Sequence, residues 1–222
     1  LMIGQKEENA LAMTASSISS LSRSLSTEKA KFTVLDGSSA DLPRATYFKD
    51  IADAIPQSLE TSSPKELESK LNELYALLEK RIAGEEATVK HFVFVHGLHR
   101  FRKLKQEDSF SWDDEGKGAG AQFGELLTQG PEYNIHFVVW CDSWNNFSRL
   151  LARKLLNEFE YRILFQMSQS DSINIIDTPD ASKLELHTAL IFEDQTGDSV
   201  KFRPFALPQQ SWWERLAIPK AV

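Results

Sequence analysis

The chain has 222 residues, of which 41% are hydrophobic and 26% are charged, so it can bury a core, and a largely disordered chain is excluded. Its formal net charge of −7 argues against a module that grips DNA by itself, although a local basic patch is compatible with that balance. No apolar run reaches the roughly 18 residues of a membrane-spanning helix, so we expect no membrane contact.

The first half of the chain alternates between strand and helix patterns. In order, it predicts a strand at Leu1–Ile3, a helix over 8–25, a strand at Lys31–Asp36, a loop at Ser38–Pro43, a short helix at Tyr47–Ile55 and a long helix at Pro64–Ala83. The long helix is the clearest, because Ser63 and Glu66 match a capping box and leucines follow at helical spacing. The start has neither the basic lead nor the cleavage site of a signal peptide, and we expect a fragment of a longer protein.

The second half continues the alternation. It predicts a strand at Phe92–Val95, a polar mobile segment at Arg100–Gly120, a helix at Phe123–Gln129, a strand at His136–Cys141, a helix at Phe147–Phe159, a strand at Arg162–Met167, a helix at Ser170–Ile176 and a hairpin of Ala189–Glu193 and Val200–Arg203. This order predicts an α/β fold, with a mostly parallel central sheet, helices on both faces and a C-terminal β-hairpin. Cys141 is the only cysteine, which fits a reducing, cytoplasmic compartment.

The turn after the first strand has the position of a phosphate-binding P-loop but not its composition. Gly4 stands at the first glycine of the pattern G-x-x-x-x-G-K-[ST]. The second glycine, the lysine and the hydroxyl residue are replaced, in that order, by Asn9, Ala10 and Leu11. Lys6 is the one cation in the turn, whereas Glu7 and Glu8 place negative charge where a triphosphate would lie and suit the positive end of a helix.

The ends of the other strands lack the carboxylates that hold Mg²⁺ in a P-loop enzyme. The strand Phe92–Val95 is followed by His96, and His96 and His99 have no third ligand near them in sequence, so no metal site is predicted. A His-Gly pair after a strand also fits the oxyanion loop of α/β-hydrolases, but the chain has no G-x-S-x-G elbow. Asp36 and Asp142 are interpreted as a turn residue and a helix cap.

Two further features have a functional and a structural interpretation. Arg100, Arg102, Lys103 and Lys105 form a basic cluster that is a candidate nucleic-acid contact or, because acidic residues follow it, a solvated loop face. The pair Trp212-Trp213 either packs back on the sheet edge or forms an exposed docking patch.

The second half of the chain resembles the FtsK/SpoIIIE family of hexameric DNA pumps. Asn134–Asp142 is similar to the family's G-I-H-L-hydrophobic-A-T-Q strand, and Arg162–Asp177 is similar to its R-I-A-F-R-V-S-S-x-x-D-S-R-T-I-L-D segment. Ala181–Leu184, followed by the strand at Ala189–Phe192, is similar to the family's A-E-x-L ending, and Thr33–Asp36 to the strand before its D-P-K turn. The resemblance covers most of residues 1–207.

The resemblance implies a RecA-like P-loop NTPase fold over residues 1–207, with a tail at 208–222. It implies the last motor-like domain of a large bacterial DNA translocase, in a family that uses ATP and magnesium. The vestigial nucleotide positions are Gly4, Lys6, Asn9, Ala10, Leu11, Asp36, His96 and Asp142. The family's Walker B carboxylates fall on His96 and Gly97 and its sensor near Asp142 or Ser143, so we expect no catalytic residue and no cofactor.

Three functions follow from these observations. The favoured one is a non-hydrolysing structural or regulatory domain that partners other motor domains of the same or a homologous chain, with DNA contacted through the full-length protein. The second is an active ATP-dependent DNA or polypeptide translocase subunit, in which Lys6, Asp36, Asp142 and Arg162 supply the site. The third is a nucleic-acid-binding module without motor activity.

Overall fold

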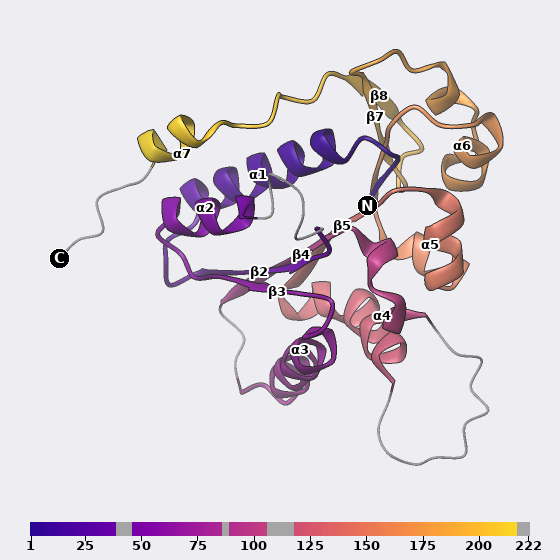
Figure 1. The fold of residues 1–222 in the computed structure, drawn as a ribbon. Coiled ribbons are helices and arrows are strands. Elements are labelled where there is room, and N and C mark those ends of the chain that lie inside the picture. Colours follow the sequence, from indigo (N-terminus) through magenta and orange to yellow (C-terminus); the bar gives the residue numbers. More distant parts are fainter. Residues whose placement is uncertain (39–45, 86–88, 106–117, 217–222) are drawn as a thin grey trace.

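A computed structural model describes residues 1–38, 46–85, 89–105 and 118–216. Its strands form one sheet in the order β3-β2-β4-β5-β1-β6-β7-β8 (Figure 1). They are β1 (Met2–Ile3), β2 (Ala30–Asp36), β3 (Leu59–Ser62), β4 (Lys90–His96), β5 (Ile135–Cys141), β6 (Tyr161–Leu164), β7 (Ala189–Glu193) and β8 (Ser199–Phe202). Neighbours from β3 to β6 are parallel, and β7 and β8 complete the sheet as antiparallel strands.

Helices cover both faces of this sheet, as the sequence predicted. They are α1 (Glu7–Ser24), α2 (Tyr47–Ala54), α3 (Leu67–Ile82), α4 (Ala119–Gln129), α5 (Trp144–Leu150), α6 (Gln169–Ile176) and α7 (Gln210–Leu216). Helices α1, α2 and α7 lie on one face, and α3 and α4 lie on the other (Figure 1). Short 3₁₀ turns connect several elements, at η1 (Leu98–Arg100), η2 (Arg102–Leu104), η3 (Gly130–Tyr133), η4 (Arg153–Glu158) and η5 (Asp180–Lys183). No helix within the described ranges is long and apolar enough to cross a membrane.

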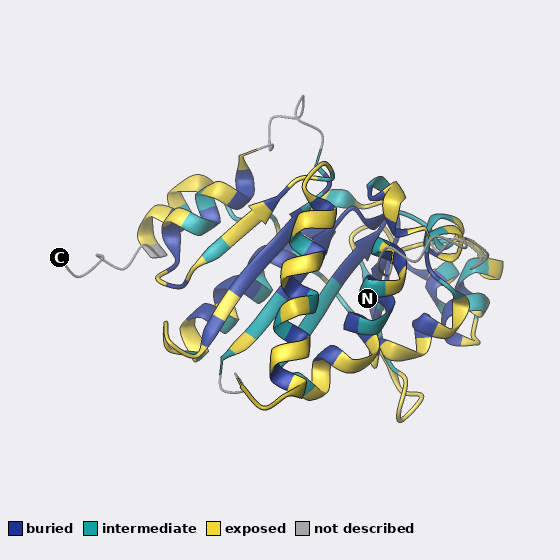
Figure 2. Ribbon diagram, turned by 90° about the horizontal axis from the view of Figure 1, so that it is seen from below, coloured by how far each residue is buried: buried dark blue, intermediate teal, exposed yellow. Residues whose placement is uncertain are grey.

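The central strands are apolar on both sides because both faces of the sheet are covered. In β4, Val93, Phe94 and Val95 are at most 1% exposed. Val93 and Val95 join the core under α3 and α4, whereas Phe94 joins the core under α1 and α2. Successive residues of a strand point to opposite faces, so this one strand contributes to both cores. Figure 2 shows the buried strands behind helices whose outward faces are exposed.

The structure differs from the sequence prediction at two elements. Strand β3 was not predicted, because Leu59 is its only apolar residue and an edge strand needs little burial. The predicted helix Phe147–Phe159 is wrong as one element, since extended backbone at Leu151 and Ala152 separates α5 from η4. The spacing of apolar residues predicted that both α5 and η4 are partly buried, but it did not predict the break between them.

The boundaries of two other segments also differ. The regular part of α3 begins at Leu67 rather than Pro64, although the Glu66 carboxylate still accepts hydrogen bonds from the Ser63 N–H at 2.8 Å and hydroxyl at 2.9 Å. The predicted tail contains α7, whose Trp213 packs on Tyr47 of α2 rather than on the sheet edge. The predicted boundary at residue 207 stays a prediction. Parts of the loop predicted at 38–43 and of the mobile segment predicted at 100–120 lie outside the described residues.

The buried leucine stripe of α3 should dominate the stability of its layer. Replacing Leu71, which is fully buried, by Ala removes packing and leaves a cavity, so we expect a loss of about 2–5 kcal/mol in the free energy of unfolding. Ile82→Ala on the same helix is the matched control, because that side chain is 48% exposed, and it should cost no more than about 0.5 kcal/mol. Urea denaturation measures both, and equal losses would contradict the assigned packing.

A partly buried histidine should make the fold sensitive to acid. Burial lowers the pKa of His91 from 6.5 to about 4, and its Nε2 lies 2.8 Å from the Thr33 hydroxyl. As the pH falls, His91 is protonated in the unfolded chain before it is protonated in the folded chain. The folded state therefore keeps its full stability above pH 6.5 and loses stability as the pH falls towards 4. We expect His91→Gln, which cannot titrate, to remove up to about 3 kcal/mol of the loss between those pH values. Identical pH profiles of unfolding for the two proteins would refute this.

Candidate functional site

The carboxyl ends of β1, β2, β4, β5 and β6 meet at one edge of the sheet, because these strands are parallel. Ligands of open α/β sheets bind at this edge. The structure brings together here Gly4 after β1, Asp36 at the end of β2, His96 at the end of β4 and Asp142 after β5. This is the edge at which the sequence placed the vestigial nucleotide positions.

The connection from β1 to α1 is only three residues long, Gly4–Lys6. Gly4 has a φ of +137°, and a Cβ there would lie 2.8 Å from the Cβ of Phe165. Its N–H donates to the Cys141 carbonyl at 3.1 Å. Gly4 is therefore needed for close packing between strands.

Because α1 already begins at Glu7, Asn9, Ala10 and Leu11 lie inside the helix. Ala10 is 0% exposed and Leu11 is 3% exposed, and both belong to the core. A P-loop wraps phosphates with the N–H groups of a loop at these positions. Here two of those positions, Ala10 and Leu11, contribute to packing, and Asn9 is half-buried.

His96 occupies the space between the start of α1 and the end of β4. It is 1% exposed, and its ring lies 4.6 Å from that of Trp140 and 5.4 Å from that of Phe48. Its Nε2 is 3.6 Å from Oε1 of Glu7, and neither ring nitrogen has a partner within hydrogen-bond distance in the described part of the chain. The Trp140 indole N–H donates to the Gly4 carbonyl at 3.0 Å, and this hydrogen bond connects the rings around His96 to the β1–α1 turn.

We call the space between the start of α1 and the end of β4 the cradle. The Glu7 carboxylate is the negatively charged group that contacts His96 in it. The contact with His96 holds the pKa of Glu7 below its usual range, with smaller contributions from Arg100 and His99. Glu7 also lies in the first turn of α1, where the helix dipole favours a negative charge. The positive end of the helix, which a P-loop offers to phosphate, thus already faces a carboxylate.

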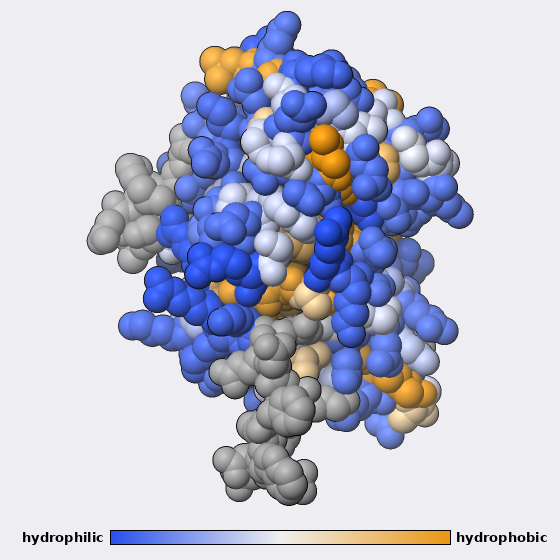
Figure 3. Space-filling model, turned by 90° about the vertical axis from the view of Figure 1, so that its right-hand side faces the viewer, coloured by the Kyte–Doolittle hydropathy of each residue, from blue (hydrophilic) through white to orange (hydrophobic). Residues whose placement is uncertain are grey.

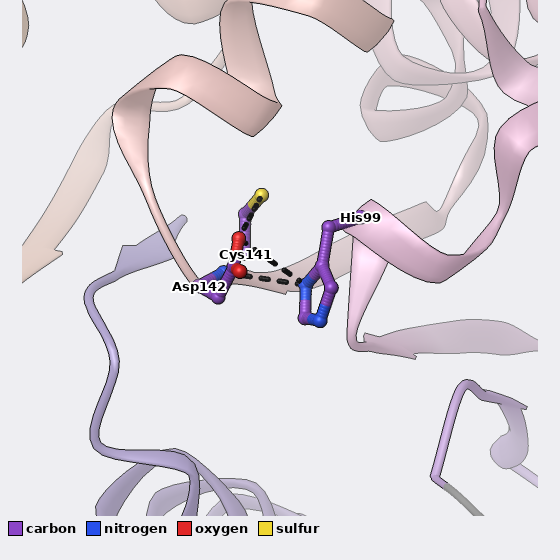
Figure 4. A group of neighbouring side chains, drawn as sticks. All are labelled: His99, Cys141 and Asp142. Carbon is purple, nitrogen blue, oxygen red and sulfur yellow. Dashed lines mark hydrogen bonds and ion pairs between the residues drawn. The ribbon is translucent and has the colours of Figure 1, made fainter.

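Next to the cradle, His99, Cys141 and Asp142 point towards one another (Figure 4). The Asp142 N–H donates to His99 Nδ1 at 3.4 Å, and the Cys141 thiol lies 3.8 Å from the Asp142 carboxylate. The three donor atoms lie within 4.8 Å of one another, close enough for a metal ion. Burial, however, raises the pKa of Cys141 to about 12, so the metal-binding thiolate is disfavoured.

Asp142 also contacts the start of α5. Its two carboxylate oxygens accept from the Asn146 side chain at 2.8 and 3.0 Å. The cap of α5 is Ser143, whose hydroxyl accepts from the Asn146 N–H at 3.3 Å, so the cap predicted at Asp142 is displaced by one residue.

The predicted basic cluster divides among three surroundings. The Arg100 Nε lies 3.5 Å from His99 Nε2 at the cradle, and Lys103 pairs with Glu68 of α3 at 3.0 Å. Arg102 and Lys105 line a separate pocket together with Arg149 of α5, which the sequence analysis did not single out.

Two other candidate residues have structural partners. Oδ1 of Asp36 accepts from the Ser38 N–H at 2.8 Å, which is the predicted turn. Arg162 is buried, donates to the Ile175 carbonyl at 2.8 Å and pairs with Asp194 at 2.7 Å. Ile175 lies in α6 and Asp194 follows β7, so these contacts link β6 to neighbouring elements and involve no residue of the β1–α1 turn.

Comparisons with known proteins bear on the fold. No protein-family model and no curated protein sequence matches this chain. Among solved structures, the DNA-packaging ATPase B204 of Sulfolobus turreted icosahedral virus superposes with a TM-score of 0.61 at 10% identity, over 92% of this chain and 96% of that one. The pCW3 conjugation coupling protein TcpA gives a TM-score of 0.66 at 12% identity, over 97% of this chain and 64% of that one. The cytoplasmic domain of EssC gives 0.55 at 13% identity, over 92% and 37%.

These neighbours are P-loop ATPases of the FtsK/HerA type, and the chain shares their fold. The P-loop NTPase fold that the sequence resemblance implied is therefore confirmed. Identities this low establish the fold alone. The chain spans less than two thirds of TcpA and of EssC.

The close packing at Gly4 can be tested against a glycine that also has a positive φ but has open space around it. Gly84 has a φ of +80° and nothing within 4 Å of an added Cβ. Gly84→Ala should cost about 1 kcal/mol from its backbone alone, whereas Gly4→Ala should cost about 1–3 kcal/mol more because its methyl meets Phe165. Thermal or urea unfolding compares the two variants. A smaller loss for Gly4→Ala than for Gly84→Ala would disprove the packing role.

Proposed function

We propose that this chain is a P-loop-fold domain that does not hydrolyse ATP and that serves a structural or regulatory role beside other motor domains. The observation that carries the proposal is the contact between Glu7 and the buried His96, which fills the cradle between α1 and β4. A carboxylate stands where a triphosphate would have to bind.

The charges at the turn support this proposal. A cavity of about 320 Å³ beside the β1–α1 turn is lined by Gln5, Lys6, Glu7, Glu8, Asn9 and His187. Its lining therefore carries two carboxylates and one lysine. Phosphoryl transfer depends on cations and Mg²⁺ that neutralise the charge developing on the phosphate, and β4 ends in His96 rather than in a carboxylate that could hold the metal.

The setting of the domain is inferred from its neighbours. B204 is a DNA-packaging ATPase and TcpA is a conjugation coupling protein, so proteins with this fold include movers of DNA. We infer that this domain docks on catalytic motor domains of its own or a homologous chain within a translocase assembly. A cytoplasmic location is consistent with the unpaired, buried thiol of Cys141 and with the cytoplasmic domain of EssC.

Calorimetry and phosphate release test the proposal together. Isothermal titration with Mg-ATP should show no binding to the domain, and phosphate release should not exceed the blank with or without DNA. Tight binding of Mg-ATP, or turnover that Lys6→Ala abolishes, would contradict the proposal.

A charge-removing variant tests whether Glu7 is the group that excludes phosphate. Glu7→Gln keeps the shape of the side chain but removes the carboxylate that contacts His96, so only Glu8 remains as an anion in the first turn of α1, and we expect measurable binding of pyrophosphate where the wild type shows none. Glu158→Gln is the control, because it removes the same charge at an exposed position in η4. Equal pyrophosphate binding by the two variants would show that Glu7 does not exclude phosphate.

A further inference from the structure

We propose that a basic pocket beside the cradle binds the phosphate groups of a polyanionic ligand. The pocket has a volume of about 600 Å³ and lies between the turns that follow β4 and the helix that follows β5. Its lining residues are His99, Arg102, Lys105, Asn146, Arg149 and Leu150. None of these lines the acidic cavity at the β1–α1 turn, so the two sites are separate.

Three cations line this pocket, and none of them is paired with a carboxylate of the described residues. Within the described residues, Arg102, Lys105 and Arg149 have no Asp or Glu oxygen within 4.0 Å, whereas Lys103, their neighbour in sequence, pairs with Glu68. They come from two segments, the turn η2 with its C-cap and the helix α5, of a chain whose net charge is −7. All three side chains are exposed and can reach an anion, and their combined positive potential points to an anionic ligand.

The acidic and titratable groups near the pocket within the described ranges leave it positive. The Asp142 carboxylate is bound by the Asn146 amide and the Ser143 hydroxyl and does not line the pocket. Burial lowers the pKa of His99, so this imidazole is neutral at neutral pH and its Nδ1 accepts the Asp142 N–H. The positive charge therefore comes from the two guanidinium groups and one ammonium group.

The chemistry of these groups favours phosphate. Guanidinium groups bind phosphate oxygens in pairs, and lysine adds a point charge. Among the described residues, the pocket lining includes no Phe, Tyr or Trp ring, so the recognition we propose rests on charge rather than on base stacking. Figure 3 views the side on which α5 and α6 lie, and hydrophilic side chains cover most of this face around several apolar patches. A nucleic-acid backbone and a free polyphosphate chain share this chemistry.

Two ligands and two variants of the whole chain test the proposal. Fluorescence anisotropy measures binding of a labelled single-stranded DNA of about 20 nucleotides at about 50 mM salt, and calorimetry measures binding of tripolyphosphate. The pocket variant is Arg102→Gln/Lys105→Gln/Arg149→Gln. The control variant is Lys29→Gln/Lys49→Gln/Lys201→Gln, which removes the same charge from exposed positions elsewhere.

We expect at least about tenfold weaker binding by the pocket variant and less than about twofold weaker binding by the control. For DNA, the slope of log K against log salt should fall in magnitude by about 2, since each phosphate contact on a single strand contributes about 0.7. Binding of DNA identifies a nucleic-acid backbone as the source, and binding of tripolyphosphate alone identifies a polyphosphate or nucleotide. The proposal is overturned if neither ligand binds, or if the pocket and control variants, both folded by circular dichroism, bind equally.

Discussion

The contact between Glu7 and His96 closes the space between the start of α1 and the end of β4, and the rest of this edge is arranged around it. The imidazole is packed between the rings of Phe48 and Trp140, so it cannot turn away from the carboxylate without opening the core. The indole of Trp140 in turn holds the Gly4 carbonyl. The short turn, the helix and two strands are thereby fixed together without a bound phosphate.

The same edge is divided electrostatically. The β1–α1 turn presents Glu7 and Glu8, whereas Arg102, Lys105 and Arg149 lie beyond the ends of β4 and β5. In a motor enzyme of this fold, cations and magnesium ligands would be concentrated at the turn. Under the proposed function, a domain with carboxylates at this turn and with cations beside it that no described carboxylate pairs is suited to holding a charged partner in place.

The sheet and its helices could be predicted because buried parallel strands such as β4 are apolar throughout, and because α3 carries a regular leucine stripe. Gly4 and the strand before it also predict where a P-loop would lie, and this assignment of positions stays a prediction. The contact of Glu7 with His96 could not, because it depends on the register that places His96 opposite Trp140 and on where α1 begins. Arg149 was missed for a related reason: it joins Arg102 and Lys105 only when α5 folds against the turns after β4.

The most direct measurement is a crystal structure of the chain grown with magnesium and a slowly hydrolysed ATP analogue at high concentration. If protein groups fill the cradle, no phosphate should be ordered over Gly4–Leu11, and Glu7 should remain beside His96. A triphosphate lying over the N-terminus of α1, with a magnesium ion bound and Glu7 displaced, would contradict the central claim.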